Sequence, residues 1–155
     1  MQTTKEASMS EVHQIAHPLI ASKLTRMRNE NTPTGEFRSL LHQITTLMAF
    51  EATRDLPTEQ ITVKTPVACA EFPTLACGRV TLAPILRAGV GMVEGMLAVL
   101  PDASVGYIGM YRDEESLQPV EYLCKLPADI SADTVIVLDP MLATGGSAID
   151  AVSTL

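Results

Sequence analysis

The 155-residue sequence is poor in several features that would point to particular protein classes. Its three cysteines, Cys69, Cys77 and Cys124, match no metal-ligand spacing, so we expect reduced thiols and a cytoplasmic location rather than a disulfide framework. No apolar run is long enough to span a membrane, and the N-terminal segment lacks the apolar core of a signal peptide. The formal net charge of −7 argues against a general binder of nucleic acids or anionic membranes.

Hydrophobic residues make up 46% of the chain and charged residues 19%, the composition of a soluble domain with a large core. Apolar runs at residues 80–86, 104–110 and 134–138 predict buried strands. Helical patterns separate or follow them, most clearly over residues 90–100. Strands that alternate with helices indicate an α/β fold with a mainly parallel sheet, whose ligands gather at the carboxyl ends of the strands.

We predict a single domain over residues 1–155, with a disordered tail at 1–10, helices within 11–56 and the α/β core at 57–155. The first helix opens at Pro18. Its basic side is expected to be solvated and comprises Lys23, Arg26 and Arg28.

A second helix is predicted from Pro33 to about Leu56, with Thr32 as its capping hydroxyl. Its apolar stripe comprises Phe37, Leu40, Leu41, Ile44, Leu47 and Met48. Short strands are expected at residues 61–69, and a protruding hairpin arm at 112–127. Pro84 indicates that the end of the strand at 80–86 is irregular or near an edge.

The most informative stretch is Thr134–Ser147, TVIVLDPMLATGGS. Its β-branched apolar start predicts a strand covered on both faces, and Pro140 ends that strand because proline cannot donate to a ladder. Two glycines and the hydroxyls of Thr144 and Ser147 then lead into a helical pattern. A strand, a glycine-rich turn and a helix N-terminus can cradle a phosphate, since free backbone N–H groups and the helix dipole favour an anion.

Two interpretations of this stretch stay open from its local pattern. It is neither an NTPase P-loop, because no lysine follows Gly146, nor a G-x-G-x-x-G fingerprint. A plain βα turn would use Gly145 and Gly146 in the same way as a phosphate cradle. Asp139, at the end of the strand, would suit a sugar hydroxyl or a phosphate-bound Mg²⁺.

Arg87 and Arg112 follow two other predicted strands, so we expect them at the same edge of the sheet as Asp139. Arginine suits pyrophosphate because its planar fork bonds two oxygens at once and stays charged. Taken singly, each arginine could instead form a surface ion pair. For Arg112 the candidate partners are Asp113, Glu114 and Glu115. Their joint placement favours a site for a ligand with phosphates at both ends.

These segments resemble the uracil phosphoribosyltransferases. LDPMLATGGS resembles the loop that binds 5-phosphoribosyl 1-pyrophosphate (PRPP), and Pro140 stands where most phosphoribosyltransferases have a second acid, as in the uracil branch. Residues 17–56 resemble the N-terminal helices of that family, 84–94 its pyrophosphate loop, and 109–117 its Met-Tyr-Arg segment. The resemblance therefore covers nearly the whole chain.

By that resemblance, Arg87 and Arg112 would hold the pyrophosphate of PRPP, and Asp139 the ribose hydroxyls. The loop around the 5′-phosphate would comprise Pro140, Met141, Leu142, Ala143, Thr144, Gly145, Gly146 and Ser147. The family further implies transfer of phosphoribosyl from PRPP to uracil, giving UMP and pyrophosphate, with Mg²⁺ on the leaving group. It also implies a cytosolic homo-oligomer, dimer or tetramer, with activation by GTP in many members.

No residue is assigned as a nucleophile or as an acid or base. Transfer builds negative charge on the leaving group, which arginines and a metal can stabilise, and rigid placement supplies much of the rest. None of the three histidines, His13, His17 and His42, follows a predicted strand. We therefore interpret Thr144 and Ser147 as phosphate ligands rather than as parts of a catalytic triad.

Family members continue past the loop helix with another strand and a Gly-Asp-Ala stretch that recognises uracil, whereas this sequence ends at Leu155. We therefore expect the final strand or strands and the uracil-binding segment to be absent, and uracil transfer by this chain alone to be weak or nil. The alternatives are a PRPP-binding regulator or non-catalytic protein on the same fold, a phosphoribosyltransferase for another base, and an unrelated doubly wound domain.

Overall fold

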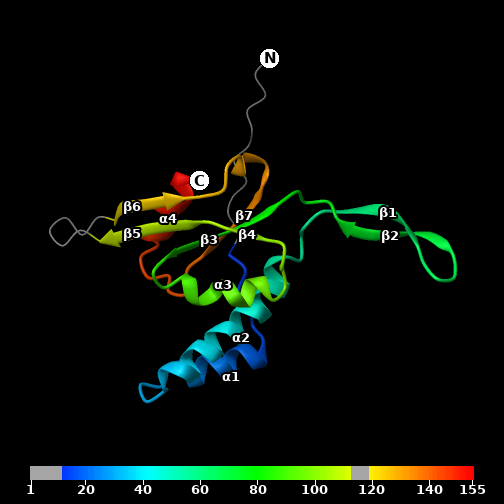
Figure 1. Cartoon of the computed structure of the whole chain (residues 1–155). Coiled ribbons are helices and arrows are strands. Elements are labelled where there is room, and N and C mark those ends of the chain that lie inside the picture. Colours follow the sequence, from blue (N-terminus) through cyan, green and yellow to red (C-terminus); the bar gives the residue numbers. More distant parts are fainter. Residues whose placement is uncertain (1–11, 113–118) are drawn as a thin grey trace.

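The computed structural model describes residues 12–112 and 119–155, so the tail predicted at 1–10 lies outside the described residues. Its main sheet is organised around β3 (Val80–Leu86), which pairs in parallel with β7 (Thr134–Leu138) on one side. On the other side β3 pairs in parallel first with β4 (Ser104–Val105) and then with β5 (Tyr107–Arg112). The outer strand β6 (Pro119–Lys125) runs antiparallel to β5, so the sheet is mixed, with its parallel part around β3 (Figure 1).

Pro84 lies inside the central strand, so the prediction of an edge there was wrong, whereas the predicted irregularity is present, because the end of β3 changes its partner from β4 to β5. The residue is fully buried and is the partner of Leu138 in β7. It falls between the residues of β3 that pair with β4 and those that pair with β5, where Gly106 interrupts the neighbouring strand. A missing N–H group is tolerated at such an interruption of the ladder.

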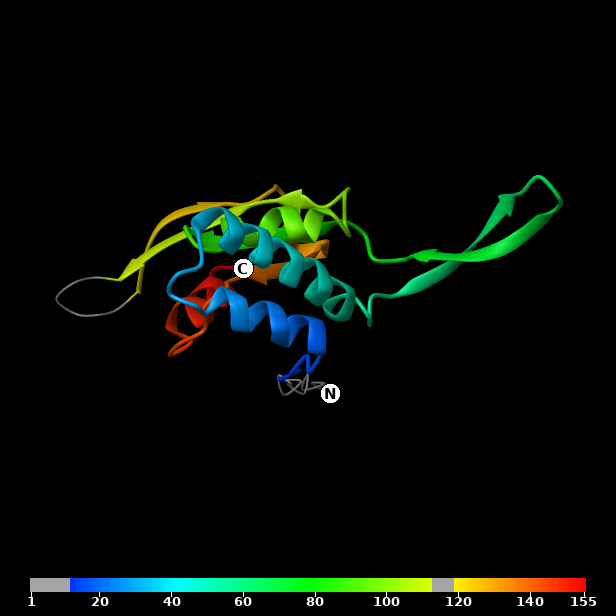
Figure 2. The same ribbon diagram turned by 90° about the horizontal axis from the view of Figure 1, so that it is seen from below.

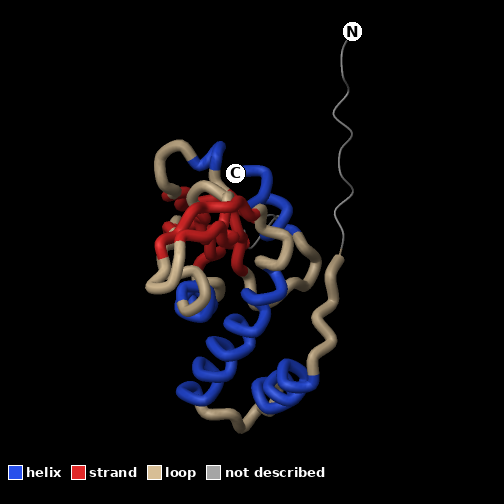
Figure 3. Tube along the Cα trace, turned by 90° about the vertical axis from the view of Figure 1, so that its right-hand side faces the viewer, coloured by secondary structure: helices blue, strands red, loops and turns tan. Residues whose placement is uncertain are grey.

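Helices cover both faces of the sheet, as Figure 3 shows. On one face α3 (Val90–Leu97) packs beneath β3, and the core there comprises Leu41, Ala49, Val80, Leu82, Met92, Val93, Met96 and Leu138. On the other face α4 (Gly146–Thr154) places Ala151 against a second cluster with Ala83, Ile85 and Ile108. Burial on both faces explains why β3 is almost continuously apolar.

Two N-terminal helices, α1 (Pro18–Met27) and α2 (Thr34–Ala52), pack outside α3. The N-cap of α2 is Pro33 and has no side-chain hydrogen bond. The predicted cap, Thr32, instead donates its hydroxyl proton to the backbone oxygen of Arg26, at 2.6 Å. The cap prediction was therefore wrong, because the end of α1 offers that hydroxyl a nearer acceptor.

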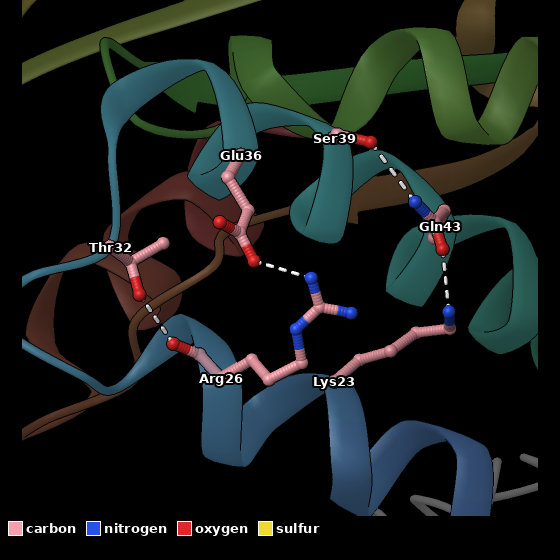
Figure 4. A network of polar contacts seen from close by, with 6 residues as sticks. All are labelled: Lys23, Arg26, Thr32, Glu36, Ser39 and Gln43. Atoms are coloured by element: carbon pink, nitrogen blue, oxygen red, sulfur yellow. Dashed lines mark hydrogen bonds and ion pairs between the residues drawn. The ribbon is translucent and has the colours of Figure 1, made fainter.

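The basic side of α1 is not merely solvated. Lys23 Nζ donates to Gln43 Oε1 of α2, and Arg26 forms an ion pair with Glu36 of α2 (Figure 4). Exposed ion pairs of this kind contribute only about 0.2–1 kcal/mol each. They fix the pairing of α1 with α2, while Leu40, Leu41 and Ile44 supply the buried part of the predicted stripe.

A second hairpin forms a long arm of β1 (Thr58–Lys64) and β2 (Cys69–Leu75), paired over their full lengths. It replaces the short strands expected at 61–69 and extends far from the rest of the chain (Figure 2). The hairpin predicted at 112–127 is present in part, since β6 lies within that range but its partner β5 starts at Tyr107, and residues 113–118 lie outside the described residues. The described residues thus form two projecting hairpins, where the sequence predicted one.

Side-chain hydrogen bonds join the amino ends of β3 and β7. Asp133, the residue between the short helix η1 (Ile130–Ala132) and β7, makes them. Asp133 Oδ2 accepts hydrogen bonds from Arg79 Nε at 2.8 Å and from Thr81 Oγ1 at 2.6 Å. These two donors, Arg79 first, lower the pKa of the Asp133 carboxyl below its usual range. Within the described residues, no helix is long and apolar enough to cross a bilayer.

Candidate functional site

The carboxyl ends of β3 and β7 bring two predicted segments together. Arg87 follows β3 and is exposed, and the Leu86–Arg87 peptide bond is cis. Asp139 follows β7, whose last residue, Leu138, pairs with Pro84 of β3. Figure 1 shows the loop after β7 and the start of α3 at the same end of the sheet. Arg87 and Asp139 thus lie on neighbouring loops, as the sequence predicted.

Gly89 sets how closely these loops approach. A Cβ on Gly89 would lie 2.3 Å from the backbone oxygen of Leu138 and 2.7 Å from the backbone nitrogen of Ile85. No side chain fits in that space, so only glycine lets the turn after Arg87 rest directly on the end of β7. The Gly89 N–H donates to Ile85 O at 2.8 Å and closes the turn.

The loop after β7 and the first turn of α4 line a small hollow of about 120 Å³. Its start is fixed by Asp139, whose Oδ1 accepts from the backbone N–H of Met141 at 3.1 Å. Its end is fixed by Gly145, which takes a φ of 81° that side chains disfavour. The lining residues are Asp139, Met141, Leu142, Ala143, Thr144, Gly145, Gly146, Ser147 and Ala148.

Two helices, α3 and α4, begin at this edge, and neither N-terminus is capped by a side chain. Gly89 is the N-cap of α3 and Gly145 that of α4. The first hydrogen bond of α4 runs from Ile149 N to Gly145 O, so the N–H groups of its first turn have no partner within the helix. Such N–H groups and the positive ends of two helix dipoles favour an anion, or a ligand with two anionic ends.

Side-chain chemistry adds to this backbone site. Asp139 has a second carboxylate oxygen, which can accept from a hydroxyl or contact a cation. Thr144 is exposed and Ser147 is half-buried, and both lie in the hollow. Met141 and Leu142 are 75% and 72% exposed, so these two positions contribute loop backbone and an apolar rim rather than polar ligands.

The structure assembles most of the predicted residues but not all. Pro140, next to Asp139, is exposed and does not line the hollow, and Arg87 lies on the adjacent loop. Arg112 is the last residue of β5 and pairs with Pro119 of β6. The suggested ion pairs of Arg112 with residues 113–115 fall outside the described residues.

Sequence reasoning missed two residues of this edge. Ala148 completes the lining of the hollow in the first turn of α4, and Gly89 permits the contact between the two loops. A glycine between a strand-end arginine and a helix was the available signal for Gly89. Its partner, the oxygen of Leu138, is 49 residues later in the chain, so only the fold reveals the contact.

The sheet and this edge define an α/β protein with a glycine-containing loop and an uncapped helix N-terminus at the carboxyl ends of parallel strands. Residues 14–155 match the family model described as Uracil phosphoribosyltransferase. The chain belongs to the uracil phosphoribosyltransferase family.

Individual relatives agree with that assignment. The chain is 55% identical over 147 residues to a uracil phosphoribosyltransferase of Clostridium novyi and 56% identical to one of Clostridium perfringens strain 13. Each match covers 95% of this chain and 70% of the relative. A solved structure, the AQ2163 protein from Aquifex aeolicus, is similar with a TM-score of 0.84 at 35% identity, covering 92% of this chain and 68% of that one.

Proposed function

We propose that this chain binds PRPP at the edge formed by β3 and β7, and that it transfers the phosphoribosyl group to uracil, giving UMP and pyrophosphate. The observation that carries the proposal is the hollow between Asp139 and Ala148 at the uncapped N-terminus of α4, in a chain that belongs to the uracil phosphoribosyltransferase family. The regulatory alternative has no comparable observation in its favour.

Each part of PRPP meets suitable chemistry at this edge. The 5′-phosphate would accept hydrogen bonds from the backbone N–H groups of Gly146, Ser147 and Ala148 and from the nearby hydroxyls. Asp139 would accept from the ribose hydroxyls. Arg87, exposed and held beside β7 by Gly89, would contact the pyrophosphate together with Arg112.

In the reaction, the bond between C1 of the ribose and the pyrophosphate oxygen breaks with its electron pair, and a bond from N1 of uracil to C1 forms. The N1 proton is released, and pyrophosphate leaves. Positive charge develops on the ribose, and negative charge grows on the leaving group, where arginines stabilise it. Fixed positions of the two ends of PRPP supply the alignment. No residue of this chain is assigned to uracil. The expectation that the chain alone transfers uracil weakly or not at all therefore stays a prediction, and the UMP assay described below tests it.

Mg²⁺ fits this site as a companion of PRPP. Among the described residues, no group of three or more His, Cys, Asp or Glu side chains could hold a metal by itself. Asp139 offers a single carboxylate of the hard oxygen type that Mg²⁺ prefers, so the ion would take most of its ligands from pyrophosphate and water. When bound, it would neutralise charge on the leaving group.

The test is protection of the chain by PRPP and Mg²⁺ against heat, followed by conversion of labelled uracil to UMP. At a concentration about one hundred times Kd, a ligand stabilises the folded state by about 2.7 kcal/mol. In a domain of this size that free energy raises Tm by about 5–10 °C. Arg87→Ala should reduce the shift, whereas Arg38→Ala, on the exposed face of α2, is the matched control.

The outcomes separate the two halves of the proposal. No Tm shift in the unaltered chain would refute PRPP binding. A normal shift without UMP formation would refute transfer by this chain and favour a non-catalytic PRPP-binding protein.

We also propose a homo-oligomer, with the arm of β1 and β2 seated on a second copy. An isolated two-stranded hairpin is marginally stable in water. The arm nevertheless exposes Ile61, Val63, Phe72 and Leu75 between about two-fifths and half. Sedimentation should show a dimer or larger assembly that Phe72→Ser weakens, and a monomeric unaltered chain would refute this part. Activation by GTP and a cytoplasmic location complete the proposal and rest on the family resemblance.

A further inference from the structure

All three tyrosines of the chain, Tyr107, Tyr111 and Tyr122, lie on the hairpin of β5 and β6. The register of this hairpin shifts between Gly109 and Met110. Gly109 pairs with Leu123, but Met110 pairs with Glu121, so Tyr122 is an extra residue of β6 without a partner in β5. Such a β-bulge bends the strand that contains it and increases its local twist.

The side chain of Tyr122 packs directly against the backbone of Gly109 at the bulge. A Cβ on Gly109 would lie 2.7 Å from Cζ of Tyr122 and 2.9 Å from Cβ of Leu123, so the tyrosine ring covers the bare face of the glycine. The ring of Tyr111 lies 6.2 Å from that of Tyr122, at an interplanar angle of 42°. Both tyrosines remain more than half exposed, at 52% and 54%. Their contacts therefore shape the hairpin more than they add to the core.

The bulge lies where the hairpin leaves the sheet. Gly109 is the last residue of β5 that pairs with β3, and its partner there is Leu86, directly before Arg87. From Met110 to Arg112, β5 pairs with β6. The direction of this outer part, which ends in Arg112, is therefore set at the level of Gly109 and Tyr122.

On the face of the hairpin opposite Gly109, a hydrogen bond joins β6 to α4, the helix that follows the hollow. Glu121, next to Tyr122, accepts a hydrogen bond at Oε2 from Thr154 Oγ1, at 2.8 Å. Thr154 is the last residue of α4, and α4 begins at the hollow with Gly146. The outer hairpin is thus held relative to two parts of the site, the end of β3 through Gly109 and the far end of α4 through Glu121.

We propose that the bulge at Tyr122 is a positioning element, which directs the outer hairpin so that the backbone of Arg112 is held at the pyrophosphate end of PRPP while α4 holds the 5′-phosphate end. This inference rests on the proposed function. Tyr122 acts through Arg112 and does not touch the reacting atoms. Displacing a positioned group by about 1 Å can cost about a hundredfold in rate, so a bend at this point is enough to matter.

The experiment deletes Tyr122, which converts the hairpin to regular pairing. Tyr122 and Leu123 lie on the same side as Gly109, so the deletion keeps the alternation of Leu123 and Glu121. Calorimetry with Mg²⁺ would measure the affinity for PRPP, for pyrophosphate and for ribose 5-phosphate. Tyr122→Phe keeps the ring and the bulge, and Tyr107→Ala removes a partly exposed tyrosine away from the bulge.

We expect the deletion to weaken PRPP and pyrophosphate binding by about tenfold or more and to leave ribose 5-phosphate within about twofold. Tyr122→Phe and Tyr107→Ala should bind all three ligands like the unaltered chain. In an Arg112→Ala background the deletion should have no further effect, because a residue that acts through Arg112 is coupled to it in a double-mutant cycle.

Three results would overturn the inference. They are unchanged PRPP affinity after the deletion, an equal loss for all three ligands, and a loss that persists in the Arg112→Ala background. If the unaltered chain binds none of the ligands, the proposed function fails and the inference fails with it. If the chain binds PRPP equally well with and without Tyr122, the inference is refuted while the proposed function stands.

Discussion

Replacing Gly89 by alanine tests whether contact between two backbone loops builds the site. The backbone of Gly89 has φ −61° and ψ −23°, which alanine adopts without strain. Any effect of Gly89→Ala must therefore come from the new methyl group. That group would lie 2.3 Å from Leu138 O, 2.7 Å from Ile85 N and 2.8 Å from Ile85 O. All three neighbours are backbone atoms, which no change of rotamer can move.

The size of the effect follows from these distances. Ordinary contact begins at 3.4 Å, so the turn after Arg87 must move away from β7 by about 1 Å. Overpacking of this kind costs about 1–3 kcal/mol, and immobile backbone neighbours favour the upper end. The same movement separates Arg87 from Asp139, and a misplacement of about 1 Å can cost about a hundredfold in rate. We expect both stability and PRPP affinity to fall.

The assay compares urea unfolding and PRPP affinity for Gly89→Ala and Gly35→Ala. Gly35 lies in the first turn of α2, and a Cβ there would meet nothing within 4 Å. Gly35→Ala should raise the free energy of unfolding by up to about 1 kcal/mol, because alanine loses less entropy in a helix. If Gly89→Ala unfolds at the same urea concentration as the unaltered chain and binds PRPP equally well, the loops do not depend on this contact.

Three further substitutions probe other parts of the chain. Gly145→Ala places a side chain at φ 81° and should cost about 1–2 kcal/mol and weaken PRPP binding, measured by urea unfolding and calorimetry; unchanged affinity would count against the loop geometry. Leu82→Ala, at a position with no exposure, should lower the free energy of unfolding by about 2.7–5 kcal/mol while the remaining folded protein binds PRPP normally. Folding lowers the pKa of Asp133 below its ordinary 3.8. The ionised carboxylate therefore contributes its full share to the free energy of unfolding above pH 3.8, and this share is lost as the pH falls through the pKa of the folded state. Asp133→Asn should therefore flatten the acid limb of a Tm-against-pH curve, and an unchanged limb would contradict the assignment.

The sequence predicted the strands of the core and the loop well, because their signals are local. The apolar runs at 80–86 and 134–138 coincide with β3 and β7. Burial on both faces accounts for the apolar sequence of β3, whereas β7, predicted to be covered on both faces, is only half-buried up to Val137. Glycines and Pro140 marked the loop after β7 in the same way. The candidate site therefore lies where parallel strands end, as a general rule for α/β sheets anticipates.

The parts that the sequence did not reveal depend on contacts between distant segments. The full arm of β1 and β2 was missed because its exposed strands have no buried face to impose a clear alternation. Pro84 could mark an irregular strand end or an edge by sequence, and only the pairing of β3 with β4 and then β5 shows that the first is the case. The bulge at Tyr122 exists only through the register of β6 against β5.

The two ends of the central sheet are held by different kinds of interaction, and this separates stability from binding. At the amino ends, Asp133 joins β7 to β3 through two hydrogen bonds, and its side chain is only 4% exposed. At the carboxyl ends, Gly89 brings the loops together by the absence of a side chain. The N–H groups in the first turn of α4 have no partner within the helix and no side-chain cap, so they can bind a ligand, whereas those at the start of α3 donate to backbone oxygens of the preceding turn. A substitution at Asp133 should therefore alter stability at acid pH with little change in ligand affinity. Gly145→Ala should instead lower both the free energy of unfolding and the affinity for PRPP.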